Sequence, residues 1–261
     1  MKDLTIIIPV NTFDQFVEEY LENAVASCKA AGKETTKMFV GPKDVLDKIK
    51  NMEGAYEDWK YVYNEKSDFS AQINTAVKEC KTKYFSILEY DDEYTKNWFK
   101  NAEEYLKCTD EEYEDISLYL PLTEIIDYED KENGPIGYMN QAVWASSFSQ
   151  KIGFLDNECL KDYMDFNTTG GIFNTEDFLM LGGLKESMKL SFWYEYLLRS
   201  INKGKKVYVI PKVGYKHLVN RPSSLMDTYR KEMDSNEADW WIELAQKEFL
   251  FTNDRNKKYE E

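Results

Sequence analysis

The 261-residue chain has only four cysteines and a single histidine. The cysteines, Cys28, Cys80, Cys108 and Cys159, are far apart and form no CxxC pair, which argues against a zinc ribbon or a thioredoxin-like redox site. Three of them lie in apolar or helical contexts, so we expect small core residues in a reducing, cytoplasmic compartment. His217 is the one histidine, and without a GxSxG pattern it gives no support to a Ser-His-Asp hydrolase.

Common nucleotide-binding patterns are also missing. No GxGxxG follows the first apolar run, which argues against a dinucleotide-binding oxidoreductase, and no GxxxxGK[ST] sequence predicts a P-loop. The net charge of −15 argues against a broad nucleic-acid-binding surface. No apolar run approaches the length of a membrane span and the N-terminus shows no signal-peptide pattern, so we expect no span.

Short apolar runs alternate with stretches of helical periodicity through the first half of the chain. Asn11 or Thr12 is the expected N-cap of the first helix, and Gly32 its expected end. This alternation predicts an α/β fold with a parallel sheet covered by helices. The strands are expected at residues 4–10, 38–40, 61–63, 84–88, 116–120 and 207–211, with a loop at 108–115 and helical stripes at 98–106 and 240–249.

The chain is organised around the segment YFSILEYDDEY, residues 84–94. Glu89, Asp91 and Asp92 follow the apolar strand directly, at the point where it should leave the sheet. Ligands bind outside the carboxyl ends of strands in open α/β sheets, and hard cations such as Mg²⁺ or Mn²⁺ prefer carboxylate and phosphate oxygens. The segment therefore predicts a metal–diphosphate site, and the simpler alternative is that Asp91 or Asp92 caps the next helix.

Four blocks resemble glycosyltransferase family 2, which has the GT-A fold. TIIIPV at 5–10 is similar to the opening strand of the family, and residues 70–94 to its asparagine-bearing helix and acidic motif. Residues 170–211 resemble its acceptor-side segment, Gly-Gly turn and acidic helix, and 215–224 resemble a C-terminal segment with a metal-binding histidine. The resemblance implies a GT-A type, mostly parallel central sheet flanked by helices over residues 1–224. Residues 225–261 are then a C-terminal helical extension that packs on the domain or a partner, including a second copy of the chain.

The resemblance also implies roles for single residues. The metal, Mn²⁺ or Mg²⁺, would be held by Asp91 first, then Asp92, with His217 completing the shell, and Glu195 or Asp177 would be the catalytic base. The implied activity is inverting transfer of a sugar from a nucleotide diphosphate, most simply a UDP-sugar, to the hydroxyl of an acceptor that the sequence does not identify. The residues implied for the donor nucleotide are Pro9, Val10, Asn11, Asp44, Asn74, Glu89, Tyr90 and Asp91.

Three departures from the family pattern leave alternatives open. The turn after the second strand is Gly41-Pro42-Lys43-Asp44 instead of an acidic Gly-Ser turn, and the first residue of the acidic motif is Glu89 instead of Asp. The usual Glu-Asp pair of the acidic helix is missing, and Phe192-Trp193 stand near its position. A GT-A-like module without catalysis is therefore the main alternative. A sugar nucleotidyltransferase is disfavoured, because no Gly-rich basic loop follows the first strand.

Simpler interpretations exist for the single candidates. Glu195 is four residues from Arg199 on a predicted helix, a spacing typical of a surface ion pair. His217 could equally be a hydrogen-bonded structural residue, and Asn74 a residue of a helix surface.

Overall fold

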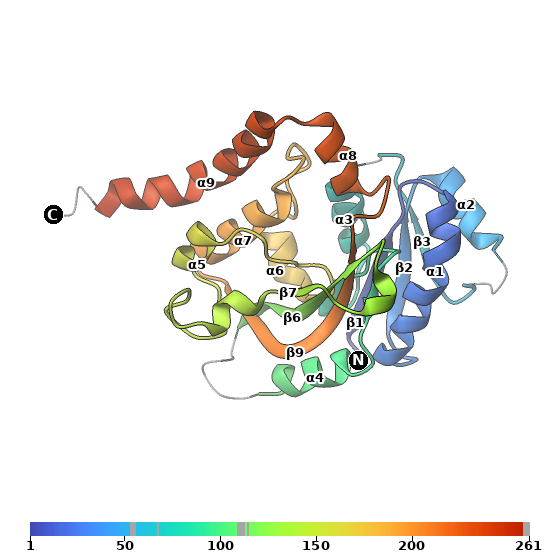
Figure 1. Ribbon diagram of the computed structural model, residues 1–261. Helices are drawn as coiled ribbons and strands as arrows, with labels where there is room; N and C mark the ends of the chain where they lie inside the picture. The colour runs from blue at the N-terminus through green and yellow to red at the C-terminus, as the bar shows by residue number, and fades with distance from the viewer. Residues whose placement is uncertain (53–55, 67, 109–112, 114, 258–261) are drawn as a thin grey trace.

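The computed structural model describes residues 1–52, 56–66, 68–108, 113 and 115–257 (Figure 1). Parallel strands form one half of the sheet in the order β3-β2-β1-β4, and β8, β6, β9 and β5 continue it. The strands are β1 Leu4–Pro9, β2 Thr36–Gly41, β3 Lys60–Tyr63, β4 Tyr84–Ile87, β5 Glu93–Tyr94, β6 Ile116–Asp127, β7 Gly137–Met139, β8 Ile172–Asn174 and β9 Lys206–Val219.

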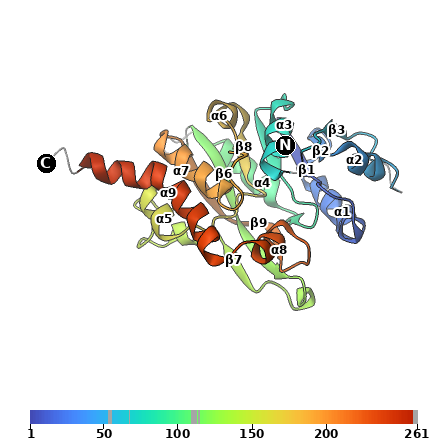
Figure 2. The same cartoon turned by 90° about the horizontal axis from the view of Figure 1, so that it is seen from above.

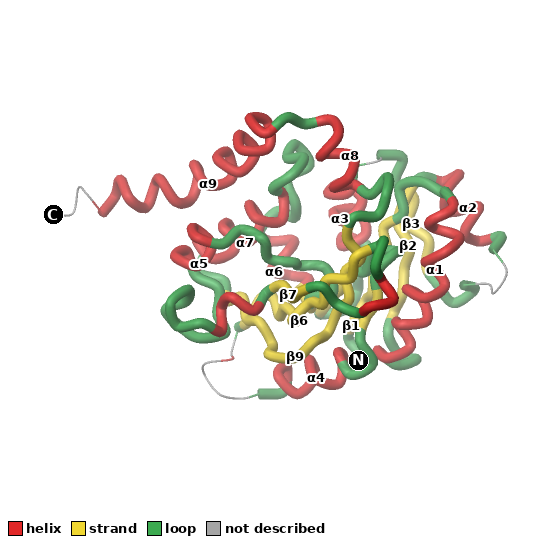
Figure 3. Tube along the Cα trace, viewed as in Figure 1, coloured by secondary structure: helices red, strands yellow, loops and turns green. Residues whose placement is uncertain are grey.

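Helices cover both faces of the sheet (Figure 3). The helices are α1 Gln15–Ser27, α2 Lys43–Lys50, α3 Phe69–Lys78, α4 Trp98–Leu106, α5 Asn157–Asp162, α6 Thr175–Met180, α7 Phe192–Asn202, α8 Leu225–Glu232 and α9 Ser235–Lys257, with short 3₁₀ turns η1 Cys28–Ala31, η3 Lys131–Asn133 and η4 Gln141–Trp144. The predicted α/β architecture with a mostly parallel central sheet is confirmed, and β5, β7 and β8 are the strands that pair antiparallel.

Strand periodicity divides the core into two layers. Ile6 and Ile8 point to the face covered by α1, α2 and α4, whereas Ile7 points to the face covered by α3, α6 and α7. All three side chains are fully buried. Successive side chains of a strand alternate between faces, so a strand covered on both sides must be apolar throughout.

The end of the chain packs on the second of these faces. Ala245 and Phe249 of α9 are buried against α7, and Figures 1 and 2 show the C-terminal part of α9 projecting away from the body. Within the described ranges, no helix combines the length and apolar character that crossing a membrane requires. The proposed boundary at residue 224 stays a prediction.

Several local predictions need correction. Asp14, not Asn11 or Thr12, caps α1, because its Oδ1 accepts the Phe16 and Val17 N–H groups at 3.0 and 3.2 Å. The strands predicted at 116–120 and 207–211 run on to residues 127 and 219. Each passes a proline, where β6 and β9 change register instead of ending. The predicted loop at 108–115 falls largely outside the described residues.

Two glycines let the second half of the sheet, formed by β8, β6, β9 and β5, close around the end of β4. A Cβ on Gly170 would lie 2.3 Å from the Tyr215 ring, and one on Gly214 would lie 2.3 Å from the Trp98 ring. The Trp98 indole N–H donates to the Gly170 carbonyl at 2.9 Å. These contacts bring β8, β9 and α4 together beside the acidic segment.

Candidate functional site

The acidic segment forms a turn at the carboxyl end of β4. The Leu88 N–H donates to the Ile7 carbonyl at 2.9 Å, and the Asp92 N–H donates to the Glu89 carbonyl at 3.1 Å. The chain then enters β5, which pairs antiparallel with β9 so that Glu93 lies opposite Lys216. This pairing brings residue 217 beside residue 92, 125 positions earlier in the chain.

Asp92 is fixed from two directions. His217 Nδ1 lies 2.9 Å from Asp92 Oδ2, and the Leu218 N–H donates to Oδ1 at 2.8 Å. Asp92 is only 2% exposed. Burial by itself lowers the pKa of His217, but Asp92, assisted by Glu89 and Asp91, raises that pKa to about 10. The carboxylate is therefore held by the histidine and by one backbone amide.

Glu89 is the more open of the two carboxylates in this group. Its backbone N–H donates to the Tyr215 hydroxyl at 3.1 Å, and among the described residues its carboxylate makes no hydrogen bond or ion pair. Burial and the neighbouring charge of Asp92 raise the pKa of Glu89 to about 8. Ligand atoms of Glu89, Asp92 and His217 lie within 4.8 Å of one another. Two carboxylates and an imidazole at this spacing suit a divalent cation such as Mn²⁺.

Asp91 is engaged elsewhere. Its Oδ2 lies 2.5 Å from Arg221 Nε, and the Arg221 guanidinium lies 4.8 Å from the ring of Phe16 and 5.2 Å from that of Tyr90. Arg221 is 3% exposed, so this is a buried ion pair covered by two aromatic rings. Burial and Asp92 raise the pKa of Asp91, while Arg221 opposes the shift. Asp91, predicted as the first metal ligand, lies outside the group formed by Glu89, Asp92 and His217.

The helix-cap alternative for the acidic residues is wrong. The next helix, α4, begins at Trp98 with Asn97 at its N-cap, and β5 lies between it and the acidic turn. Asp91 and Asp92 bind Arg221 and His217 instead of a helix terminus. The sequence could not show this, because β5 has only two residues and carries no periodic signal.

Four of the residues predicted to hold the nucleotide, Pro9, Val10, Asn11 and Asp44, lie at the ends of β1 and β2. The Val10 N–H donates to the Val40 carbonyl at 2.9 Å, and a Cβ on Gly41 would lie 2.1 Å from the Val10 carbonyl oxygen. Asn11 Oδ1 is buried and has no hydrogen-bond partner among the described residues. Asp44 lies in the first turn of α2, which starts two residues after β2 ends. Pro9 ends β1.

Asn74 lies on α3 and binds a distant loop. Its Nδ2 donates to the Leu184 carbonyl and its Oδ1 accepts the Leu184 N–H, both at 2.8 Å. A Cβ on Gly183 would lie 2.3 Å from Asn74 Oδ1, and Gly183 has a φ of 69°. Asn74 therefore fixes the turn between α6 and α7, a contact that accounts for both of its amide atoms.

Both predicted bases are ion-paired. Glu195 is 1% exposed; its Oε1 accepts from Arg199 Nε at 2.9 Å and its Oε2 from Arg199 Nη2 at 2.8 Å. Lys185 Nζ lies 3.0 Å from Glu195 Oε1. Asp177 Oδ1 lies 2.5 Å from Lys205 Nζ. The predicted pairing of Glu195 with Arg199 is confirmed, although the pair is buried and not a surface pair, and the catalytic roles stay predictions.

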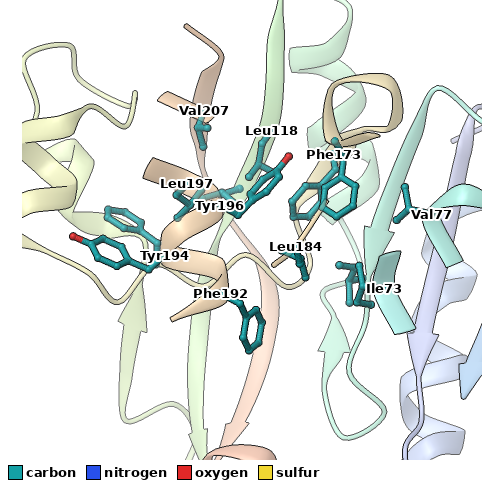
Figure 4. Close-up of a cluster of buried hydrophobic side chains, with 14 of the residues drawn as sticks. Ile73, Val77, Leu118, Phe173, Leu184, Phe192, Tyr194, Tyr196, Leu197 and Val207 are labelled. Atoms are coloured by element: carbon teal, nitrogen blue, oxygen red, sulfur yellow. The ribbon is translucent and has the colours of Figure 1, made fainter. Parts of the chain in front are cut away.

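Aromatic side chains occupy the start of α7, where the family pattern has two acids. Phe192 lies 5.5 Å from the ring of Phe69, and Trp193 lies 5.6 Å from that of Phe173. Figure 4 shows Phe192 and Phe173 within the same buried cluster as Tyr196. The Ser191 hydroxyl, just before α7, donates to a carbonyl of α9 at 2.6 Å. This end of α7 is therefore built for packing.

Sequence reasoning gave no role to two residues of the site. Tyr215 accepts the Glu89 N–H through its hydroxyl, and Arg221 pairs with Asp91. Both flank His217 in the same segment, which is the only signal the sequence offers for them.

Comparisons with known proteins agree with this arrangement. The model of the family described as Glycosyl transferase family 2 matches residues 5–154. No curated protein sequence matches the chain.

Among solved structures, S. aureus TarS 1-349 in complex with UDP-GlcNAc has a TM-score of 0.61 at 13% identity, covering 96% of this chain and 74% of that one. A second crystal structure of S. aureus TarS 1-349 gives 0.58 at 15% identity, with coverage of 96% and 73%. The mannosyltransferase PcManGT from Pyrobaculum calidifontis, in complex with GDP-Man and Mn²⁺, gives 0.60 at 13% identity, covering 85% and 58%. At these identities the likeness shows the fold, whereas the family match over more than half of the chain shows that it belongs to glycosyl transferase family 2.

Proposed function

We propose that this glycosyltransferase is metal-dependent and inverting, and that it takes its sugar from a nucleotide diphosphate. The convergence of Glu89, Asp92 and His217 at the carboxyl end of β4 carries the proposal. These residues would hold Mn²⁺ or Mg²⁺, and a bound divalent cation stabilises the charge that develops on a departing diphosphate. The Mn²⁺ in the mannosyltransferase structure supports this choice of cation.

The protein's own contribution at this site is to fix the ligands. The Leu218 N–H holds one oxygen of Asp92, and an outer contact of this kind orients a metal ligand. Arg221 neutralises the nearby carboxylate of Asp91. The negative charge of Asp91 therefore does not add to that of Glu89 and Asp92. We therefore move the proposed metal ligation from Asp91 to Glu89, with Asp92 and His217 kept.

The nucleotide is proposed to lie over the ends of β1 and β2. Pro9, Val10 and Asn11 form that edge, and the unpaired Oδ1 of Asn11 is a hydrogen-bond acceptor without a partner among the described residues. UDP-GlcNAc bound to TarS and GDP-Man bound to the mannosyltransferase support a nucleotide-sugar donor of this type. A UDP-sugar is our first candidate.

Glu195 or Asp177 would act as the base that removes the proton from the acceptor hydroxyl. An inverting transfer needs a base beside the attacking hydroxyl. Glu195 would first have to lose Arg199 or Lys185, and Asp177 would have to lose Lys205. Glu195 is the first candidate of the two, because Asp177 lies on α6, which begins beside the start of β4, whereas the acidic turn follows the end of that strand.

The test is a calorimetric titration of UDP-GlcNAc and GDP-Man with and without Mn²⁺, on the unchanged chain and on two variants. Asp92→Asn removes a buried ligand, while Glu93→Gln changes the exposed carboxylate next to it. We expect metal-dependent binding to vanish in the first and survive in the second. Equal binding by both variants would remove Asp92 from the site.

A module that binds without catalysis is the second candidate, favoured by the aromatic pair at 192–193. Incubation of a nucleotide sugar with Mn²⁺ and no acceptor separates the two. Slow release of free sugar indicates an enzyme, and binding without any release indicates the module.

A further inference from the structure

An open cavity lies at the opposite edge of the sheet from the acidic group. Its volume is about 760 Å³, and it lies where β4 begins and β8 ends. The lining residues are Cys80, Lys81, Thr82, Lys83, Asn174, Thr175, Glu176, Leu179 and Met180. Because β4 runs from this edge to Glu89 at the other, a ligand here would not touch the proposed donor site.

We propose that this cavity binds a small anion joined to an apolar group, such as an alkyl phosphate. Cavities of several hundred Å³ with a few convergent polar groups are the usual form of small-molecule sites. The proposal is independent of the proposed function.

The polar wall has an unsatisfied group and two cations. Thr175 is 7% exposed, and its hydroxyl has no hydrogen-bond partner among the described residues. Buried polar groups are nearly always hydrogen-bonded, so an orphan hydroxyl in a cavity wall points to a ligand. Lys81 and Lys83 are exposed at the same wall and, in the described part of the chain, form no ion pair with a carboxylate.

Charge selects an anion. The chain carries a net charge of −15, yet this lining has two lysines against the single carboxylate of Glu176. Lys83 Nζ lies 5.1 Å from the ring of Tyr84, which is not one of the lining residues. Burial raises the pKa of the Cys80 thiol to about 12, so this side chain is neutral and adds no anion of its own.

The opposite wall is apolar and exposed. Leu179 and Met180, on α6, are 42% and 64% exposed. Adjacent exposed apolar side chains beside a cationic wall match a ligand with a charged head and a hydrocarbon body. Inorganic phosphate alone would use only the first wall.

The experiment titrates the full chain with octyl phosphate, with inorganic phosphate and with octyl glucoside. We expect octyl phosphate to bind at least tenfold more tightly than either of the others, because each of them supplies only one of the two contacts. UDP-GlcNAc with Mn²⁺ should not displace it. Displacement, or equal affinity for octyl phosphate and phosphate, would overturn the proposal.

Matched variants test the two walls separately. The double change Lys81→Gln and Lys83→Gln should weaken octyl phosphate binding about tenfold, whereas Lys161→Gln, an exposed lysine on α5, should change nothing. Met180→Gln should weaken octyl phosphate but not phosphate, and Glu176→Gln should strengthen both. If the double variant and the Lys161 control behave alike, the cavity is not an anion site.

Anionic and neutral lipid vesicles then distinguish the source of the ligand. Sedimentation with anionic vesicles that is lost in the double lysine variant indicates a lipid headgroup. Binding of octyl phosphate without sedimentation indicates a soluble amphiphile.

Discussion

The molecule contains two groups of buried charges that differ in what they leave open. In the group around Glu195, every carboxylate oxygen has a cationic partner, from Arg199 or Lys185. In the group around Asp92, the partners are one histidine and one backbone amide, and Glu89 keeps a carboxylate without a bond among the described residues. Both oxygens of Glu195 are therefore occupied by cations, whereas the carboxyl of Glu89, beside Asp92 and His217, is available to a ligand such as a divalent cation.

The largest expected effect is a loss of stability in the group around Glu195. Glu195→Gln should lower the free energy of unfolding by about 3–5 kcal/mol, since it leaves Arg199 buried without its counter-charge. Urea denaturation measures this, with Glu243→Gln on exposed α9 as a control that should stay within about 0.5 kcal/mol. Equal stability of the two variants would mean that the Glu195 pair contributes nothing to folding.

A change in the group around Asp92 should affect metal affinity more than stability. Asp92→Asn should reduce Mn²⁺ affinity roughly 100-fold while costing less stability than Glu195→Gln, because a metal ligand is lost and a neutral amide can still accept the Leu218 N–H. Titration of Mn²⁺ by calorimetry, alongside urea denaturation of the same sample, gives both quantities. If the Asp92→Asn variant binds Mn²⁺ as the unchanged chain does, the group around Asp92 is not a metal site and does not differ in this respect from the group around Glu195.

The stability of the fold should also depend on pH, through Glu89 and His217. The pKa of Glu89 is raised to about 8 and that of His217 to about 10, so the folded chain holds more protons than the unfolded chain. Stability should therefore fall as pH rises through about 4.5–8 for Glu89 and about 6.5–10 for His217.

Thermal unfolding between pH 5 and 10 measures this dependence. Glu89→Gln should flatten the lower part of the curve and His217→Asn the upper part. A wild-type curve that rises over this range would contradict both assignments.

The smallest effect is expected from the conservative change Arg221→Lys in the ion pair of Asp91 and Arg221. Arg221→Lys keeps the charge next to Asp91 but loses the planar group that lies against Phe16 and Tyr90. We expect a loss of about 1 kcal/mol of stability and a smaller change in Mn²⁺ affinity than Asp92→Asn gives. Arg221→Met should cost more, since it leaves Asp91 buried without its cation. A Lys variant no more stable than the Met variant would show that charge is irrelevant here.

Local spacing in the sequence predicted some contacts of single residues, but not the partners that come from distant parts of the chain. The pairing of Glu195 with Arg199 followed from their i,i+4 spacing, but its burial depends on α9 and on the loop that carries Lys185. Asn74 matched a family position, yet its partner is Leu184, 110 residues away, which no local pattern indicates.

The sequence by itself determined the alternation of strands and helices, the parallel half of the sheet and the place of the acidic segment at a strand end. These follow from periodicity and from the change between apolar and charged residues, which are local properties. Only the tertiary structure decided which carboxylate stands free. The two-residue strand β5 sets Asp92 against His217, and the turn after β9 sets Arg221 against Asp91. Adjacent carboxylates look alike in a sequence, and their chemistry differs here because different distant residues reach them.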